Sequence, residues 1–298
     1  MKKILLYLSG ALIIIYVLLN FIDFHSEYKS ERALWIINKQ FFNLAKDPKA
    51  IPDATFNTLI KDYESYGKKY SYSKLVPASE IFLGRVYAIK ENYVKAREIY
   101  EETFKKNRSN ADIAVQALVE IGQTYAAQKD EANLLNTYER ILKDYPLTNL
   151  GIHIPILKAK LYSQNNHYKQ AMQSLDEAIE YYKNLIAKHP NSQVEVISLR
   201  LLGISYMDKK EWEAGVKTFC DLLLKYPDTQ NPKNIESIVK TINTISIMQL
   251  KNFNIPMDFY NKFITTHPNH PFNKQFTEIL NKIIELKEKT TQSTNKKN

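Results

Sequence analysis

The sequence is poor in the residues that build tight turns. Seven glycines and 11 prolines make up 18 of 298 residues, about 6%, which is half of the usual ~12%. Sandwiches, barrels and doubly wound sheets need frequent tight turns, so this composition argues against them; it also excludes collagen-like and low-complexity chains. A glycine-poor chain with 20 tyrosines, and with Lys, Glu, Leu and Ile throughout, is typical of an all-α protein.

Cysteine and catalytic motifs are nearly absent. Cys220 is the only cysteine, which excludes an intrachain disulfide and a cysteine-based zinc site. The sequence contains no Walker loop, G-x-G-x-x-G, H-E-x-x-H or G-x-S-x-G motif. The six histidines are scattered, and His267 and His270, which flank a Pro-Asn turn, have no Cys or carboxylate close by in sequence. We therefore expect no enzyme activity, no metal, no cofactor and no small-molecule substrate.

The positive charge is not gathered in the body of the chain. The formal net charge is 41 − 32 = +9, and part of the excess lies in Lys2, Lys3 and the lysines of residues 281–298. Both signs of charge are interleaved between these ends. A nucleic-acid-binding surface needs Lys and Arg concentrated on one face, so we expect no nucleic-acid partner.

One long apolar run lies near the N-terminus. Residues 4–22 carry no charge, and only Ser9, Gly10 and Asn20 interrupt the apolar side chains. At 1.5 Å per residue, a run of this length spans the ~30 Å hydrocarbon layer of a bilayer. The run therefore predicts a membrane-spanning helix.

The charges around this run predict its orientation. Lys2 and Lys3 precede it, and Asp23 follows it. The positive-inside rule then keeps the N-terminus in the cytoplasm and sends the rest of the chain across. Residues 1–23 are predicted to be an uncleaved transmembrane signal anchor.

Two alternatives to this topology stay open. A cleaved signal peptide usually has an apolar core of about 7–15 residues that ends in small residues. The longer run here is followed by Asp23-Phe24-His25-Ser26, which offers no good cleavage site, and no cysteine follows for a lipid anchor. The second alternative is a cytoplasm-facing adaptor with inverted topology.

A four-fold internal repeat follows the anchor. The motif Gly-x-x-Tyr occurs at Gly84/Tyr87, Gly122/Tyr125 and Gly203/Tyr206, and a fourth copy has Ala159/Tyr162. Pro146 and Pro227 follow the second and fourth small residues by 24 positions, each in a Tyr-Pro pair. In the third unit the closing pair, His189-Pro190, comes seven residues later, which predicts two extra helical turns.

The spacing of apolar residues in each unit predicts two antiparallel helices. In the first unit, apolar residues between Ile81 and Ile89 recur at helical spacing, Lys90-Glu91-Asn92 makes a polar turn, and Tyr93–Phe104 resumes the spacing. We expect Gly84 and Ala96 to be small because the two helices cross closely there, with tyrosines beside the crossing. A closing proline ends the second helix because it lacks an N–H and clashes with the preceding turn.

These residues resemble the tetratricopeptide repeat family, whose pattern has Leu-Gly, Tyr, Ala, an aromatic residue and a closing Pro over 34 residues. Arg108 stands in place of the first closing proline, and Leu134 and Gly215 replace the Ala in two units. The resemblance implies an all-α solenoid of antiparallel helix pairs. The residues that carry it are Gly84, Tyr87, Ala96, Gly122, Tyr125, Pro146, Ala159, Tyr162, Ala171, Gly203, Tyr206 and Pro227.

The flanks of the repeats complete the predicted organisation. Residues 289–298 are rich in Thr, Gln, Ser, Asn and Lys, cannot bury a core, and are expected to be disordered. The other predicted segments are the anchor at 1–23, a juxtamembrane helix and degenerate first helix pair at 24–76, four repeats at 77–230, and a degenerate repeat with a capping helix at 231–288.

The resemblance implies that function lies in a groove lined by the first helices. The residues that directly follow the small residues are expected to face it, together with a residue one turn earlier: Arg85, Gln123, Lys160, Ile204 and Arg200. Arg and Lys there can hold a peptide carboxylate through charge-assisted hydrogen bonds. The alternative is an ordinary solvated helix face.

Anchor and repeats together predict a membrane-tethered scaffold on the extracytoplasmic, periplasmic side of the cell inner membrane. It is expected to bind other proteins or peptides and to assist secretion, folding or complex assembly in the envelope. The architecture is similar to bacterial inner-membrane tetratricopeptide proteins such as the translocon-associated periplasmic subunit. The Tyr-Pro-x-Thr helix ends also resemble the outer-membrane-protein assembly lipoprotein scaffold, although the lipid-bearing Cys is missing. A non-catalytic accessory of an envelope enzyme stays open.

Overall fold

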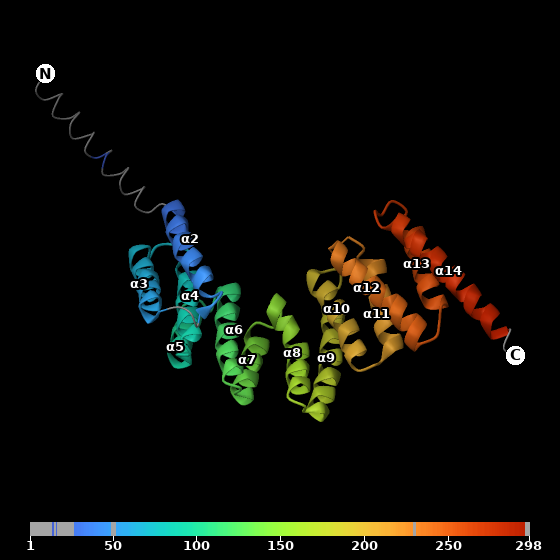
Figure 1. Cartoon of the computed structure of the whole chain (residues 1–298), viewed down its shortest axis with the longest axis horizontal. Coiled ribbons are helices and arrows are strands. Elements are labelled where there is room, and N and C mark those ends of the chain that lie inside the picture. The colour runs from blue at the N-terminus through green and yellow to red at the C-terminus, as the bar shows by residue number, and fades with distance from the viewer. Residues whose placement is uncertain (1–13, 15, 17–26, 49–51, 229–230, 296–298) are drawn as a thin grey trace, which may run out of the picture. The chain divides into compact units, whose positions relative to one another are not determined.

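The computed structural model describes residues 14, 16, 27–48, 52–228 and 231–295, and all regular structure in these ranges is helical (Figure 1). The chain divides into two compact units, residues 1–148 and 149–298. The helices of unit 1 are α2 (Glu27–Leu44), α3 (Asp53–Lys69), α4 (Val76–Ile89), α5 (Tyr93–Lys106), α6 (Ala111–Ala127) and α7 (Glu131–Asp144).

Unit 2 holds the remaining helices. They are α8 (Asn149–Gln164), α9 (Tyr168–Lys188), α10 (Gln193–Asp208), α11 (Trp212–Lys225), α12 (Pro232–Thr244), the π-helical turn η2 (Ile245–Gln249), α13 (Asn254–Thr266) and α14 (Asn273–Asn295). Within each unit, consecutive helices pack as antiparallel pairs, and first helices of neighbouring pairs also contact each other: α4 touches α6, and α8 touches α10. The described residues thus form all-helical, tetratricopeptide-like stacks.

The predicted membrane anchor, residues 1–23, lies outside the described residues except for Ile14 and Tyr16. Among the helices of residues 27–48, 52–228 and 231–295, none combines the length and the apolar character that crossing a bilayer requires.

The turn inside each helix pair contains a residue in the left-handed region that is not glycine. Glu91, Lys129, Asn166 and Lys210 have φ between 58° and 63° in these turns, each directly before the N-cap of the second helix. The N–H of that N-cap donates to the carbonyl of the repeat tyrosine, a closure typical of helix C-termini. These hydrogen bonds are Asn92 to Tyr87 (2.9 Å), Asp130 to Tyr125 (2.9 Å), His167 to Tyr162 (2.8 Å) and Glu211 to Tyr206 (2.9 Å).

The closing prolines act as predicted. Helices α7 and α11 end at Asp144 and Lys225, two residues before Pro146 and Pro227, because the residue that precedes a proline is disfavoured in the helical region. In the third pair, α9 has 21 residues whereas α7 and α11 have 14 each, so the two additional turns expected from the later His-Pro pair are confirmed.

The repeat glycines make room for side chains of the second helix, which differs from our expectation. A Cβ on Gly84 would overlap the ring of Tyr100, and a Cβ on Gly203 would lie 2.5 Å from Cε1 of Phe219. The aromatic ring therefore fills the space over the glycine itself. We expected instead that two small residues, Gly84 and Ala96, would meet at the crossing with aromatic rings beside them.

Residues 289–295, part of the segment that we expected to be disordered, continue α14 to Asn295. A helix that is already packed lengthens at little cost, because each further residue adds a hydrogen bond without a new nucleation step. The preceding turns supply that support: Phe276, Leu280 and Ile283 of α14 are buried in the C-terminal core. The composition of residues 289–295 did not predict this continuation of the helix, because these residues have no apolar side chains that would indicate packing.

Candidate functional site

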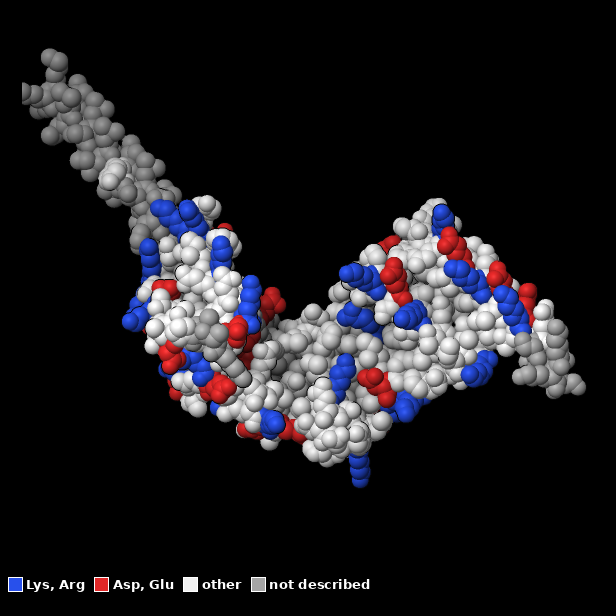
Figure 2. Space-filling model, in the orientation of Figure 1, with Lys and Arg blue, Asp and Glu red and all other residues white. Residues whose placement is uncertain are grey.

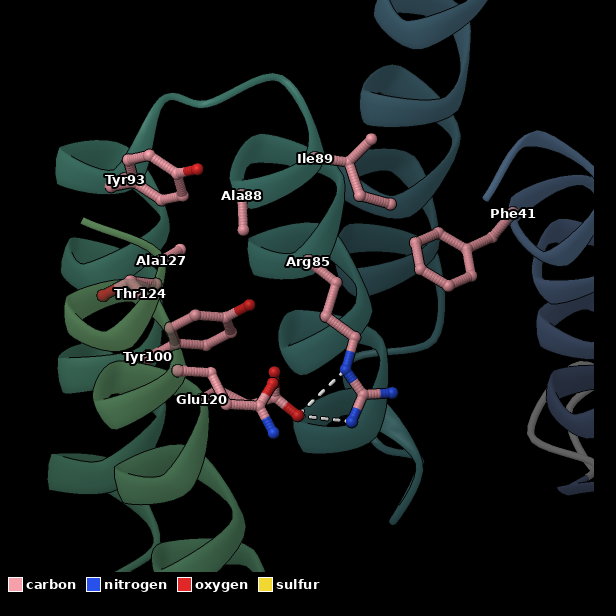
Figure 3. A pocket seen from close by; sticks show the side chains of 10 residues that line it. Phe41, Arg85, Ala88, Ile89, Tyr93, Tyr100, Glu120, Thr124 and Ala127 are labelled. Atoms are coloured by element: carbon pink, nitrogen blue, oxygen red, sulfur yellow. Dashed lines mark hydrogen bonds and ion pairs between the residues drawn. The ribbon is translucent and has the colours of Figure 1, made fainter. Parts of the chain in front are cut away.

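Unit 1 contains a hollow of about 340 Å³ beside α4 and α6, which we name the α4–α6 hollow (Figure 3). Arg85 and Ala88 of α4, Tyr100 of α5, and Glu120 and Gln123 of α6 are among its lining residues. Two of the residues expected in the groove, Arg85 and Gln123, therefore share one hollow.

An ion pair closes one side of the α4–α6 hollow. Arg85 donates from Nε to Oε1 of Glu120 at 2.9 Å and makes a second hydrogen bond from Nη2 to the same oxygen. The Glu120 side chain is only 6% exposed, and the guanidinium of Arg85 lies 5.0 Å from the ring centroid of Phe82. Arg85 is thus engaged inside the protein, so its charge is already balanced before any ligand arrives.

Tyr100 forms an apolar wall of the same hollow. Its ring is fully buried, and burial raises the pKa of its hydroxyl, with the nearby Glu120 adding to the rise. The group therefore stays neutral at physiological pH and acts as a packing residue.

Unit 2 contains a larger hollow of about 460 Å³ between α8, α10, α11 and α12, which we name the α8–α12 hollow. Its floor is apolar and includes Ile156, Leu201, Ile204, Phe219 and Ile238. The remaining three residues expected in the groove, Lys160, Arg200 and Ile204, all line this hollow. The structure therefore divides the five expected residues between two hollows, one in each unit.

The cations of the α8–α12 hollow differ from Arg85 because they form no salt bridge with the described part of the chain. Among the described residues, no carboxylate lies within 4.0 Å of the ammonium of Lys160, and none pairs with Arg200. The positive charge of Lys160 acts on Asp208, where burial raises the pKa of the carboxyl group and Lys160 opposes that rise. Two positive charges therefore stand over an apolar floor, and neither forms a salt bridge within 4.0 Å with a described carboxylate.

A row of polar side chains completes the α8–α12 hollow and was not expected from the repeats. Asn234, Ser237 and Thr241 of α12 line it together with the cations. Their spacing of three and four residues places them on one helix face, and this spacing is the sequence signal that would have identified them. The sequence-based prediction also missed Glu120 as a lining residue of the α4–α6 hollow. The sequence signal that could have identified it is a single charged residue inside the apolar stretch of α6.

The repeat-signature residues hold the pairs together and line neither the α4–α6 hollow nor the α8–α12 hollow. Ala159 and Ala171 instead line a separate hollow of about 340 Å³, which Lys160 also lines. Gly84, Ala96, Ala159, Ala171 and Gly203 are buried, whereas the repeat tyrosines are half-buried and close the helix-pair turns through their carbonyls. His267 donates a hydrogen bond from Nε2 to the Leu224 carbonyl at 2.9 Å, which makes it a packing residue.

Comparison with known proteins identifies the repeats. Residues 116–148 and 158–192 match the family model for the tetratricopeptide repeat, so one repeat is detected at the end of unit 1 and one near the start of unit 2. No curated protein sequence matches the chain.

Solved structures resemble the chain more loosely. BtubC from P. vanneervenii is 13% identical, with a TM-score of 0.40 over 86% of this chain and 92% of that one. A tetratricopeptide repeat protein from Parabacteroides merdae is also 13% identical, with a TM-score of 0.37 over 88% and 93% of the two chains.

Proposed function

We propose that the chain is a tetratricopeptide scaffold that binds segments of partner proteins, with the α8–α12 hollow as its main binding site. The observation that carries this proposal is the pair Lys160 and Arg200, which stand over an apolar floor and form no salt bridge with the carboxylates that the structure describes. A partner segment that carries a carboxylate next to an apolar side chain would bind both features, since a charge-assisted hydrogen bond and apolar burial act together. The mechanism is reversible binding without chemistry.

The α4–α6 hollow has a secondary role in this proposal. Its one cation, Arg85, is already paired with Glu120. A ligand in this hollow would contact a surface whose charges are already balanced. We therefore expect the α4–α6 hollow to recognise the shape of a partner segment and not its charge.

We further propose that residues 4–22 tether the scaffold to the cell inner membrane with both units on the extracytoplasmic side. The support is the uncharged apolar run with Lys2 and Lys3 before it. Tethering confines scaffold and client to one surface and so raises their effective concentration. In that place the scaffold would assist secretion, folding or assembly of envelope proteins.

A photo-crosslinking experiment in membranes tests the binding site. A photoreactive amino acid at Ile204 in the full chain is expected to give a crosslinked partner, and Lys160→Gln with Arg200→Gln is expected to reduce its yield at least fivefold. The matched control is Lys169→Gln with Lys217→Gln, which removes the same charge from exposed positions of α9 and α11 outside the hollow. Equal losses in both variants, or no loss in either, would refute the site.

A reporter fused to the C-terminus tests the topology separately. Activity of a reporter that works only outside the cytoplasm supports the proposed orientation, and activity of one that works only inside it assigns the inverted topology. Neither result depends on the crosslinking experiment.

A further inference from the structure

Helix α2 presents an aromatic stripe to the solvent. Tyr28, Trp35 and Phe42 are 68%, 62% and 55% exposed. They are seven residues apart, which places them on one face because two helical turns cover about seven residues. They are three of the five exposed aromatic side chains among the described residues.

The opposite face of α2 is already used for packing. Leu34, Phe41 and Leu44 are buried in the core that α2 shares with α3 and α4. Phe42 lies at the border of the two faces: its ring packs edge-on against Phe41 and Phe82, with centroids 5.5 and 5.8 Å away, while more than half of its side chain stays exposed. Three aromatic rings in a row are a larger apolar surface than the single exposed side chains that are normal for a protein.

Basic side chains border this stripe. Arg32 and Lys39 are exposed on the same side of the helix, and the ammonium of Lys39 lies 5.5 Å from the centroid of the Trp35 ring. Figure 2 shows Lys and Arg side chains gathered over the α2 end of unit 1, at the upper left. Tyr and Trp next to Lys and Arg are the residues that favour the membrane–water interface, where ring bodies meet acyl chains and charges meet phosphates.

The position of α2 in the chain also favours a lipid bilayer as the surface that contacts the stripe. Its first residue, Glu27, follows Ile22, the last residue of the apolar run, by five positions. Five residues reach at most about 18 Å. If residues 4–22 span the bilayer, as we propose above, α2 begins within this distance of the lipid surface.

We propose that the Tyr28–Trp35–Phe42 face of α2 lies on the bilayer surface and holds unit 1 against it. This proposal rests on the membrane anchor of the proposed function. A second copy of the chain fits less well, because the stripe exposes on the order of 400 Å², whereas a stable interface needs about 800 Å² per partner.

Trp35 fluorescence in vesicles tests the proposal. The full chain with Trp212→Phe, which leaves Trp35 as the single tryptophan, is reconstituted into vesicles of equal parts phosphatidylcholine and phosphatidylglycerol. We expect at least twofold quenching by lipids brominated near the headgroup, little quenching by acrylamide, and a loss of at least half of the lipid quenching after Tyr28→Ser with Phe42→Ser. The control Val94→Ser with Leu147→Ser changes exposed apolar residues of unit 1 outside α2 and is expected to leave the quenching unchanged.

Flotation of the vesicles separates the two proposals. A chain that stays with the vesicles after alkaline carbonate washing supports the anchor. If acrylamide quenches Trp35 in that chain and brominated lipid does not, the surface contact of α2 is refuted while the anchor stands. If the chain does not float, the anchor fails and this proposal fails with it. Protection from acrylamide that rises with protein density, without quenching by brominated lipid, assigns the face to a second copy and also overturns the proposal.

Discussion

The ring of Tyr100 in α5 occupies the space that a side chain on Gly84 in α4 would need. Phe219 stands in the same relation to Gly203, again 16 residues later in the chain. Each of these helix pairs therefore has a glycine and an aromatic ring as complementary parts of one contact. The repeat glycines are required by the partner ring, since no described glycine has a positive φ.

Gly84→Ala is expected to destabilise the protein by about 1 kcal/mol. Moving a fully buried ring costs about 1–3 kcal/mol, and the better helix propensity of alanine offsets up to about 1 kcal/mol of that. Urea unfolding of the full chain in detergent micelles, followed by circular dichroism, measures the change. Gly67→Ala in α3 is the control: nothing lies within 4 Å of its Cβ, so the substitution is expected to stabilise by about 1 kcal/mol. A loss of stability in both variants would contradict the proposed contact.

Arg85→Ala is expected to cost about 2 kcal/mol, because it leaves the carboxylate of Glu120 buried without its partner. Adding Glu120→Gln removes the uncompensated charge and is expected to recover at least half of the loss. A double-mutant cycle from thermal unfolding measures the coupling. A coupling near zero would mean that the pair does not act as a unit.

Lys129→Gly is expected to stabilise the turn between α6 and α7 by about 0.5–1 kcal/mol. Lys129 has φ 58°, a conformation that costs a residue with a Cβ about 1–2 kcal/mol, while glycine loses about 0.5–1 kcal/mol more entropy on folding. Asn166→Gly in the next pair is the comparison and is expected to gain less, because asparagine tolerates this region. Hydrogen exchange of the α6 and α7 amides reports the change locally.

Acid is expected to loosen the contact between α10 and α11 through Glu195. Burial alone would raise the pKa of Glu195, but hydrogen bonds from Lys225, Tyr226 and the backbone N–H of Asn191 outweigh it and hold the pKa below its usual value. A carboxylate with a lowered folded-state pKa contributes stability above its unfolded value of about 4.3, and this contribution is lost as the pH falls through the folded-state value.

Glu195→Gln should therefore destabilise unit 2 by about 1–3 kcal/mol at pH 7, because charge-assisted hydrogen bonds are lost, and by progressively less as the pH falls below about 4. Thermal unfolding at a series of pH values measures this. The control Glu177→Gln alters an exposed pair with Lys158 and is expected to change stability by less than about 0.5 kcal/mol at every pH. Parallel pH curves for wild type and Glu195→Gln would disprove the role of this carboxylate.

Cys220 is expected to react slowly with thiol reagents until unit 2 unfolds. Burial raises the pKa of its thiol to about 12, so its thiolate fraction at pH 8 is about one in ten thousand. Labelling of the native chain at pH 8 should be roughly a thousandfold slower than in urea, and its rate should keep rising up to at least pH 10. A rate that levels off near pH 9 would show an ordinary, accessible thiol.

The sequence determined the local architecture because helix pairs are built from contacts between residues close along the chain. Scarce glycine, the Gly-x-x-Tyr spacing and the closing prolines predicted the helix pairs, and the later His-Pro pair predicted the longer α9. Residue type and helical spacing settle such features without knowledge of distant parts of the fold. Composition did not indicate that α14 runs on through residues 289–295, because their support comes from the packed turns of α14 before them.

Only the tertiary structure decided which charges are free to act. Arg85 and Lys160 hold equivalent positions after the small residue of their repeats, so the sequence pattern treats them alike. Packing of α6 on α4 brings Glu120 to Arg85, whereas among the described residues no carboxylate reaches Lys160 within 4.0 Å. The distance between groups on different helices depends on how the helices pack, and Coulomb energy depends on that distance and on burial. For the same reason the sequence did not show that α2 leaves three aromatic rings facing outward.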